Sequence, residues 1–309
     1  MNIAALIPKM ILLFALIFLG YFASKLRLLG PDAKKALADL VLNISCPATT
    51  VLAVAKSTHA MSNTEVIGIL LISAAIFGCL IAFSYGFTAV LRIKKSQAGI
   101  YRFMIVFSNC GFLGFPVVQA LSGGDAVFIA SMYNLIFSLL VFTFGINQVS
   151  SAGDGSKQKF NVKMLCTPML ITTVLSLILY LTNAPFHPMV VEVLEMLDKI
   201  TAPASMLVIG CALAAYPMKQ IFGKWQVYVM SLFRLIILPV LTWLVLRLFI
   251  TNEMVLSVLV VMTALPVATN GSLLCAKYGG DESTAASGLF ISTLLSLATL
   301  PLLLQFMFG

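Results

Sequence analysis

Residues 108–116 read Ser-Asn-Cys-Gly-Phe-Leu-Gly-Phe-Pro and stand in the middle of an apolar segment, 99–121, that is long enough to cross a lipid bilayer as a helix. A second apolar segment, 254–277, is interrupted by Leu-Pro-Val-Ala-Thr-Asn-Gly-Ser at 265–272. Proline removes a backbone donor and clashes with the preceding turn, and glycine lowers the cost of unwinding. Both segments are therefore predicted to be helices that break near their centres. The residues expected to shape the breaks are Gly111, Gly114, Pro116, Pro266 and Gly271.

The composition is that of an integral membrane protein. Apolar residues make up 61% of the 309 residues, charged residues 10%, and the mean hydropathy is +1.06. Soluble domains are about 25% charged, so this chain has too little charge to cover a surface that faces water. The net charge of +8 comes from Lys and Arg in short gaps between apolar runs. That distribution follows the positive-inside rule and does not indicate nucleic-acid binding.

The apolar runs predict an all-α, polytopic membrane protein with ten transmembrane helices, because a bilayer core takes about 20 helical residues. Residues 1–149 form the first half, 150–160 a cytoplasmic linker rich in Ser, Gly and Lys, and 161–309 the second half. Most basic residues lie in the gaps after odd-numbered spans, so both termini are expected outside the cytoplasm, in the cell inner membrane. The predicted spans are 4–24, 35–56, 65–91, 99–121, 125–147, 162–183, 189–216, 224–249, 254–277 and 283–307.

The two halves show signs of an internal repeat. Residues 47–49 (Pro-Ala-Thr) match 203–205 (Pro-Ala-Ser), and 123–125 match 279–281 (both Gly-Gly-Asp). The offset is the same in both cases, since 203 less 47 and 281 less 125 both give 156. Five spans is an odd number, so the second half must be inverted in the membrane. Inverted repeats are typical of secondary transporters.

The two broken spans indicate where a ligand would bind. Irregular backbone at membrane depth is tolerated only inside protein or beside a wet cavity, and paired interrupted helices point to a binding site near the bilayer midplane. The start of a half-helix carries free N–H groups and about half a positive charge, which suits a carboxylate. Asn109 and Asn270 lie in the two breaks. The alternative is a pair of ordinary kinks without a ligand.

The sequence resembles the auxin efflux carrier family, which includes bacterial organic-acid carriers and the plant PIN-type auxin exporters. The likeness covers nearly the whole chain. It rests on the motifs at 19–21, 43–48, 109–116, 265–270 and 278–281. The resemblance implies two inverted five-helix repeats whose broken helices four and nine cross. It also implies a scaffold of spans 1, 2, 6 and 7, a moving part of spans 3–5 and 8–10, an elevator-like motion that carries an organic anion, and a homodimer.

The resemblance also implies which side chains meet the substrate. The amides of Asn109 and Asn270 would hold its carboxylate, while Pro116 and Pro266 would shape the crossing. The sequence lacks the long central loop of the plant exporters, and the only acid of span three, Glu65, lies at its outer end. These departures argue against auxin as the substrate and against a copied proton relay. The full set of expected substrate-binding residues is Asn109, Asn270, Ser45, Tyr133 and Asn134.

Arg234 lies ten residues beyond Lys224, about 15 Å along a helix, and therefore near the bilayer midplane. A charge at that depth is expensive and usually faces the protein interior. Arg234 is a possible charge partner, which would balance an anionic substrate or stabilise the moving part. The alternatives are snorkelling, or pairing with carbonyls at a helix end.

The remaining charged groups have simpler interpretations. Glu195 and Lys199 are expected to form an i,i+4 ion pair. The alternative is a proton or sodium site in the group Glu192, Glu195, Asp198 and Lys199. Helix caps are predicted at Asp125 and Asp281. The two histidines, His59 and His187, fall in outer loops and are expected to be solvated, with no metal site.

The sequence features distinguish three classes of function: a carrier, an intramembrane hydrolase and a channel. A carrier of small organic anions fits the repeats and the broken helices. An intramembrane hydrolase does not, because Asp125 has no second acid at membrane depth and Ser272 no histidine to activate it. A channel or a carrier of a non-carboxylate solute is the alternative. The chain has no ATP-binding loop, so a proton, sodium, exchange or the membrane potential must supply the energy. No cofactor is expected.

Overall fold

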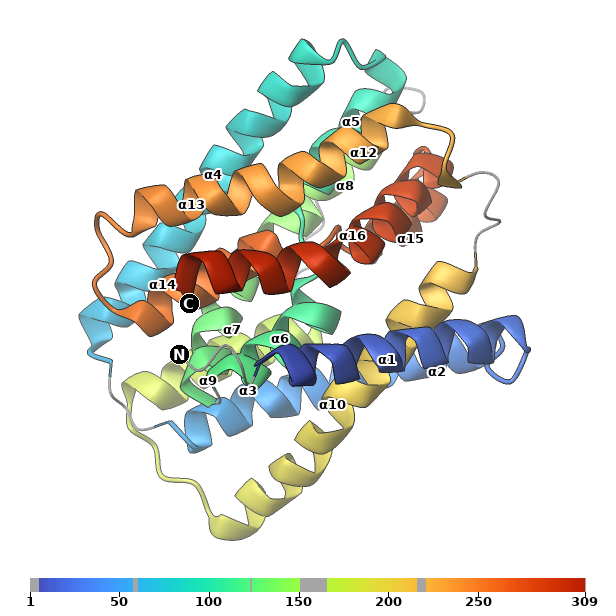
Figure 1. Cartoon of the computed structure of the whole chain (residues 1–309). Coiled ribbons are helices and arrows are strands. Elements are labelled where there is room, and N and C mark those ends of the chain that lie inside the picture. The colour runs from blue at the N-terminus through green and yellow to red at the C-terminus, as the bar shows by residue number, and fades with distance from the viewer. Residues whose placement is uncertain (1–5, 58–60, 123, 151–165, 216–220, 309) are drawn as a thin grey trace.

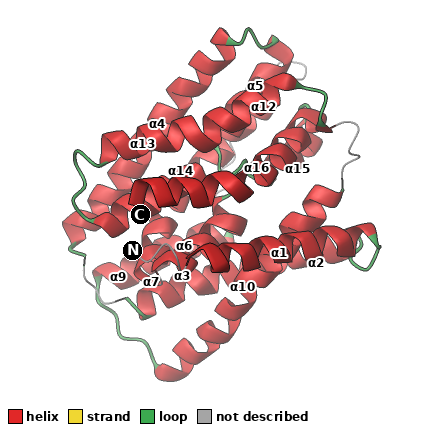
Figure 2. Ribbon diagram, viewed as in Figure 1, coloured by secondary structure: helices red, strands yellow, loops and turns green. Residues whose placement is uncertain are grey.

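The computed structural model describes residues 6–57, 61–122, 124–150, 166–215 and 221–308. Every regular element in these ranges is a helix (Figure 2). Most of the predicted linker, 150–160, lies outside the described residues. The helices are α1 (Leu6–Lys25), α2 (Pro31–Leu40), α3 (Cys46–Ala55), α4 (Asn63–Val90), α5 (Lys95–Val106), α6 (Phe115–Ser122), α7 (Gly124–Leu140), α8 (Ile146–Ser150), α9 (Pro168–Leu181), α10 (Pro188–Ala214), α12 (Trp225–Leu232), α13 (Leu238–Leu246), α14 (Glu253–Ala264), α15 (Asn270–Tyr278) and α16 (Glu282–Phe308).

In the described ranges, four π-helical turns interrupt the helices or begin them. Each is five residues long, and each widens the helix locally so that the following side chains face a new direction. The turns at 41–45, 141–145 and 233–237 join α2 to α3, α7 to α8 and α12 to α13. The fourth, at 110–114, begins the segment that α6 continues.

Each predicted span overlaps at least one helix, and the chain is a polytopic membrane protein. Among the described residues, six helices are long and apolar enough to cross a bilayer, and four shorter apolar helices accompany them. Large apolar side chains such as Leu248, Phe249 and Phe306 stay exposed on the outer surface, as a surface covered by lipid requires. The six long helices are Pro31–Ala55, Asn63–Val90, Gly124–Ser150, Pro188–Ala214, Trp225–Leu246 and Glu282–Phe308.

The helices form two groups with α6 and α7 between them (Figure 1). On one side, α10 packs against α1, α2 and α3, and α3 packs against α9. On the other, α4 packs against α5, α13 against α14, and α12 against α16. Helix α7 contacts α3, α4 and α14, and so joins the two groups.

Local sequence explains how α4 begins. The hydroxyl of Ser62 accepts a hydrogen bond from the backbone N–H of Glu65, while the carboxylate of Glu65 accepts one from the N–H of Ser62 at 2.7 Å. This capping box satisfies two N–H groups that the helix cannot pair internally. Glu65 is thus a capping residue at the end of its helix, as its predicted place at the outer end of span three suggests.

Helices α1 and α10 cross in very close contact at two glycines. A Cβ atom on Gly20 would lie 2.5 Å from the carbonyl oxygen of Leu207, and one on Gly210 would lie 2.6 Å from the backbone nitrogen of Tyr21 and still closer to the carbonyl of Ile17. These neighbours are backbone atoms, which cannot rotate away. Only glycine allows this approach.

We therefore expect Gly210→Ala to destabilise the protein by at least about 2 kcal/mol, because overpacking of this kind costs about 1–3 kcal/mol even against side chains. Unfolding in detergent measures the effect. Gly78→Ala is the matched control, because no atom lies within 4 Å of the new Cβ in α4. That variant should gain up to about 1 kcal/mol, since alanine favours helix more than glycine. Equal stability of the two variants would refute the close crossing.

Candidate functional site

The two predicted breaks are present, and they face each other. Helix α5 ends at Val106 and α14 ends at Ala264. The backbone N–H of Asn109 donates to the carbonyl of Pro266 at 2.9 Å, and the N–H of Ala268 donates to the carbonyl of Phe107 at 3.1 Å. These two bonds form a short antiparallel bridge. Each break therefore satisfies backbone groups of the other, which makes unwound chain tolerable inside an apolar bundle.

The residues predicted to shape the breaks have different roles. Pro266 lies in the unwound segment itself. Pro116 instead lies at the second position of α6, directly after the π-helical turn 110–114. Gly271 lies in the first turn of α15, where a Cβ would come within 2.8 Å of the ring of Phe103. Gly111 and Gly114 lie in the π-helical turn 110–114.

A cavity of about 150 Å³ lies at the meeting point of the breaks. Its volume suits a small organic molecule. Three of the five predicted substrate-binding residues line it: Asn109, Asn134 and Asn270. The wall is mixed, with amides and hydroxyls beside aromatic side chains such as Phe112 and Phe137. Further polar residues of the wall, which the sequence analysis did not single out as ligands, are Asn43, Ser108, Ser138, Thr167 and Thr269.

Asn109 has the most informative side chain of the cavity. It is 3% exposed and immediately precedes the π-helical turn 110–114. Its side chain makes no capping bond to that turn. The Oδ1 atom accepts a hydrogen bond from the Thr269 hydroxyl at 3.4 Å, and the Nδ2 atom has no partner among the described residues. A buried donor without a partner costs about 1–3 kcal/mol. A residue of the cavity wall therefore carries a buried donor that lacks a partner among the described residues.

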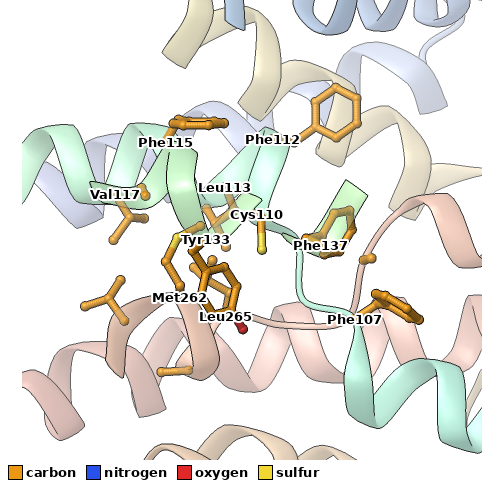
Figure 3. Packing of buried hydrophobic residues seen from close by; sticks show 14 of the residues in the cluster. Phe107, Cys110, Phe112, Leu113, Phe115, Val117, Tyr133, Phe137, Met262 and Leu265 are labelled. Atoms are coloured by element: carbon orange, nitrogen blue, oxygen red, sulfur yellow. The ribbon is translucent and has the colours of Figure 1, made fainter. Parts of the chain in front are cut away.

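Two of the predicted substrate-binding residues, Ser45 and Tyr133, lie outside the lining of this cavity. Tyr133 is fully buried, with its ring centroid 4.8 Å from that of Phe77. Figure 3 shows the Tyr133 ring beside Met262 and Leu265, in the apolar packing around the breaks. The hydroxyls of Tyr133 and Ser45 have no hydrogen-bond partner among the described residues. The neighbouring Asn134 lines the cavity in place of Tyr133, because adjacent helical residues point about 100° apart.

Arg234 is 1% exposed and binds the ends of both broken helices. Its Nε donates to the carbonyl of Leu265 at 3.2 Å, and its Nη1 donates to the carbonyl of Ile105. These carbonyls belong to the C-terminal ends of α14 and α5, where the helix dipoles place negative charge. The predicted alternative of pairing with helix-end carbonyls is thus confirmed. Cys110, which lines the cavity, lies within electrostatic reach of the guanidinium.

The predicted ion pair between Glu195 and Lys199 on α10 is wrong. Glu195 forms an ion pair with Lys56 at 2.6 Å, rather than with Lys199. Lys56 immediately follows α3, and α3 packs along α10, so its side chain reaches Glu195 from the neighbouring helix. Asp198, one turn further along, accepts hydrogen bonds from Thr49 and Gln119.

The predicted cap at Asp281 is confirmed. Its Oδ1 accepts a hydrogen bond from the backbone N–H of Thr284 at 2.9 Å, in the first turn of α16. Gln97 donates to its Oδ2 at 2.8 Å, and Lys224 lies 3.4 Å away. Partial burial alone raises the pKa of the Asp281 carboxyl. The bonds from Thr284 and Gln97 and the charge of Lys224 outweigh burial, so this pKa lies below its usual value.

The other predicted polar residues lie away from the cavity. Asp125 is in the first turn of α7, as predicted. His187 is exposed and its ring accepts a hydrogen bond from the N–H of Met189, while His59 lies outside the described residues. Within the described ranges, no three His, Cys, Asp or Glu residues come together as a metal site would need.

Two interrupted helices that meet inside an apolar helical bundle and line a small cavity are typical of membrane transporters. A sequence profile described as membrane transport protein matches residues 5–304. The chain belongs to this family, the auxin efflux carrier family, as the motifs at the breaks predict.

Relatives similar to this chain are named as transporters. An uncharacterized transporter of Methanocaldococcus jannaschii is 26% identical over 307 residues, which cover 96% of this chain and 98% of the relative. The uncharacterized transporter YfdV of Escherichia coli is 23% identical and covers 93% of each chain. A protein of Rhizobium meliloti named "Putative malonate transporter" is 25% identical over 300 residues, or 93% of this chain and 91% of the relative.

Proposed function

We propose that this protein is a secondary transporter for small carboxylates and that the cavity between the breaks is its substrate site. The observation that carries the proposal is the buried Nδ2 of Asn109, a donor at the cavity wall without a partner among the described residues. A carboxylate oxygen is a strong acceptor for such a donor. Asn134 and Asn270 supply further amides around the same space.

The electrostatics of the breaks support an anion. The segment that begins at Cys110 and the helix that begins at Asn270 both start at the cavity, and helix starts carry partial positive charge. On the other side of each break, α5 and α14 end with partial negative charge, which the guanidinium of Arg234 offsets. The relative named for malonate supports a dicarboxylate.

The proposed architecture is that of an elevator. Ten membrane spans would form two inverted five-helix repeats, 1–149 and 161–309, in the inner membrane with both termini outside the cytoplasm. Spans 1, 2, 6 and 7 would be a scaffold through which two copies pair, and spans 3–5 and 8–10 would carry the substrate. The family membership and the meeting of the two breaks support this arrangement.

Binding of malonate to the full-length protein in detergent tests the substrate class. A ligand at a hundred times its dissociation constant stabilises the folded state by about 2.7 kcal/mol, so malonate should raise the melting temperature. Malonamide, which has nearly the same shape without the charges, is the control and should have no effect. Equal shifts with both compounds, or none across a panel of mono- and dicarboxylates, would reject a carboxylate site.

Counterflow separates a carrier from a channel. In proteoliposomes loaded with unlabelled malonate, a carrier takes up labelled malonate by exchange and the uptake saturates, because one site serves both sides in turn. A channel gives uptake that rises in proportion to concentration and gains nothing from the internal malonate.

A further inference from the structure

Asp198 is an acid placed at membrane depth and away from the cavity. It is the eleventh residue of α10, which begins at Pro188, and therefore lies about 15 Å along that helix. Met196 and Ile200, on either side of it in the sequence, expose apolar side chains on the outer surface. An ionisable residue at this depth is costly and, by default, functional.

Neutral groups from two other helices hold the carboxylate. The hydroxyl of Thr49 on α3 donates to Oδ1 at 2.8 Å, and the amide of Gln119 on α6 donates to Oδ2 at 2.8 Å. The hydroxyl of Thr201 lies 2.9 Å from that of Thr49 and extends the network. Thr49 and Thr201 are almost completely buried.

No basic side chain of the described residues forms an ion pair with this acid. The two salt bridges in the described part of the chain join Lys56 to Glu195 and Lys224 to Asp281. Lys199 follows Asp198 but is exposed, and Cys46 is the titratable group of α3, within electrostatic reach of Asp198. Helix α6 has no titratable side chain. Among the described residues, the contacts that hold the carboxylate are the hydrogen bonds from Thr49 and Gln119.

The network joins the cavity segment to its neighbours. Helix α6 directly continues the turn 110–114, whose first three residues line the cavity. Gln119 is therefore on the same helical segment as the proposed substrate site, while Thr49, Asp198 and Thr201 are on α3 and α10. The bond from Gln119 to Asp198 links α6 to α10.

Protonation of Asp198 would change this link. An ionised carboxylate accepts hydrogen bonds at both oxygens, whereas a protonated acid turns one oxygen into a donor. Bonds to an ionised group are also roughly twice as strong as those between neutral groups. The bond between Gln119 and Asp198 is therefore stronger when Asp198 is charged than when it is neutral.

We propose that Asp198 is a proton-binding site on the scaffold helix α10 and that its protonation releases α6, so that acid pH frees the segment that lines the substrate cavity to move. The transport part of this inference rests on the proposed function. The proton site itself does not, because a proton can bind to Asp198 whatever the substrate is.

Infrared difference spectra of the full-length protein in lipid, recorded between acid and neutral pH, test the proton site directly. The carbonyl band of protonated carboxylic acids should contain a component from Asp198, and we expect Asp198→Asn to remove that component. Glu195→Gln is the matched control on the same helix and should keep it. A spectrum of Asp198→Asn with the same band as the wild type would overturn the proposal.

Malonate exchange in proteoliposomes with the same pH on both sides tests the release of α6. The wild type should exchange malonate faster at acid than at neutral pH, because the bond between Gln119 and Asp198 is weaker when Asp198 is neutral. Asp198→Asn and Gln119→Leu should lose this response, while Gln119→Leu keeps the Asp198 component of the infrared band. A pH response that persists in Asp198→Asn would overturn the role of Asp198 in the movement. Absence of malonate uptake in every variant would count against the proposed substrate, while the infrared result would still decide the proton site.

Discussion

Asn109→Ala is expected to weaken malonate binding about tenfold to a hundredfold, because a hydrogen bond to a charged group contributes about 1.5–3 kcal/mol. Asn109→Asp should weaken it further. The new carboxylate would keep the shape of the side chain but replace the free donor at Nδ2 with a negatively charged acceptor beside the anion. Melting temperature against malonate concentration, followed by counterflow in proteoliposomes, measures both effects.

Two variants control for general damage. Asn63→Ala removes the same side chain at an exposed position in the first turn of α4 and should leave malonate binding unchanged. Tyr133→Phe removes a hydroxyl that lies near the breaks but outside the cavity lining, and should also bind malonate normally. If Tyr133→Phe abolishes binding while Asn109→Ala does not, the substrate occupies a different space from the cavity.

The breaks could be predicted from sequence because their cause is local. Proline and glycine act on the backbone of their own turn, so the runs at 108–116 and 265–272 are sufficient to predict where each helix unwinds. The pairing of the breaks depends on distant chain. Two backbone bonds join the breaks, one between Asn109 and Pro266 and one between Ala268 and Phe107. They require one particular alignment of the two segments, and the local sequence of either segment does not determine that alignment.

The side chains of the cavity were predicted less completely, because a one-residue shift changes the direction of a helical side chain by about 100°. Asn134 lines the cavity and its neighbour Tyr133 does not. The π-helical turn 41–45 has a similar effect, since Asn43 lines the cavity while Ser45 is buried elsewhere. Glu195 likewise pairs with Lys56, which follows the neighbouring helix α3, and not with Lys199 on its own helix.

Arg234→Leu is expected to destabilise the protein by about 3–6 kcal/mol, since it removes two hydrogen bonds from a charged group worth about 1.5–3 kcal/mol each. The carbonyls of Ile105 and Leu265 would lose their partner at the C-terminal ends of α5 and α14, inside the bundle. Arg234→Lys should recover only part of this loss. An ammonium is a compact point charge without the planar fork that lets Arg234 reach both carbonyls. Unfolding in sodium dodecyl sulfate compares the variants.

Arg247→Leu is the matched control, because Arg247 ends the same membrane span but is exposed and stacks on Trp243, with 4.6 Å between its guanidinium and the ring centroid. Losing that contact should cost no more than about 1 kcal/mol. If Arg234→Leu is as stable as Arg247→Leu, the two backbone bonds between the breaks hold the crossing alone. If Arg234→Leu alone loses much of its stability, one buried cation holds both broken helices in position around the cavity.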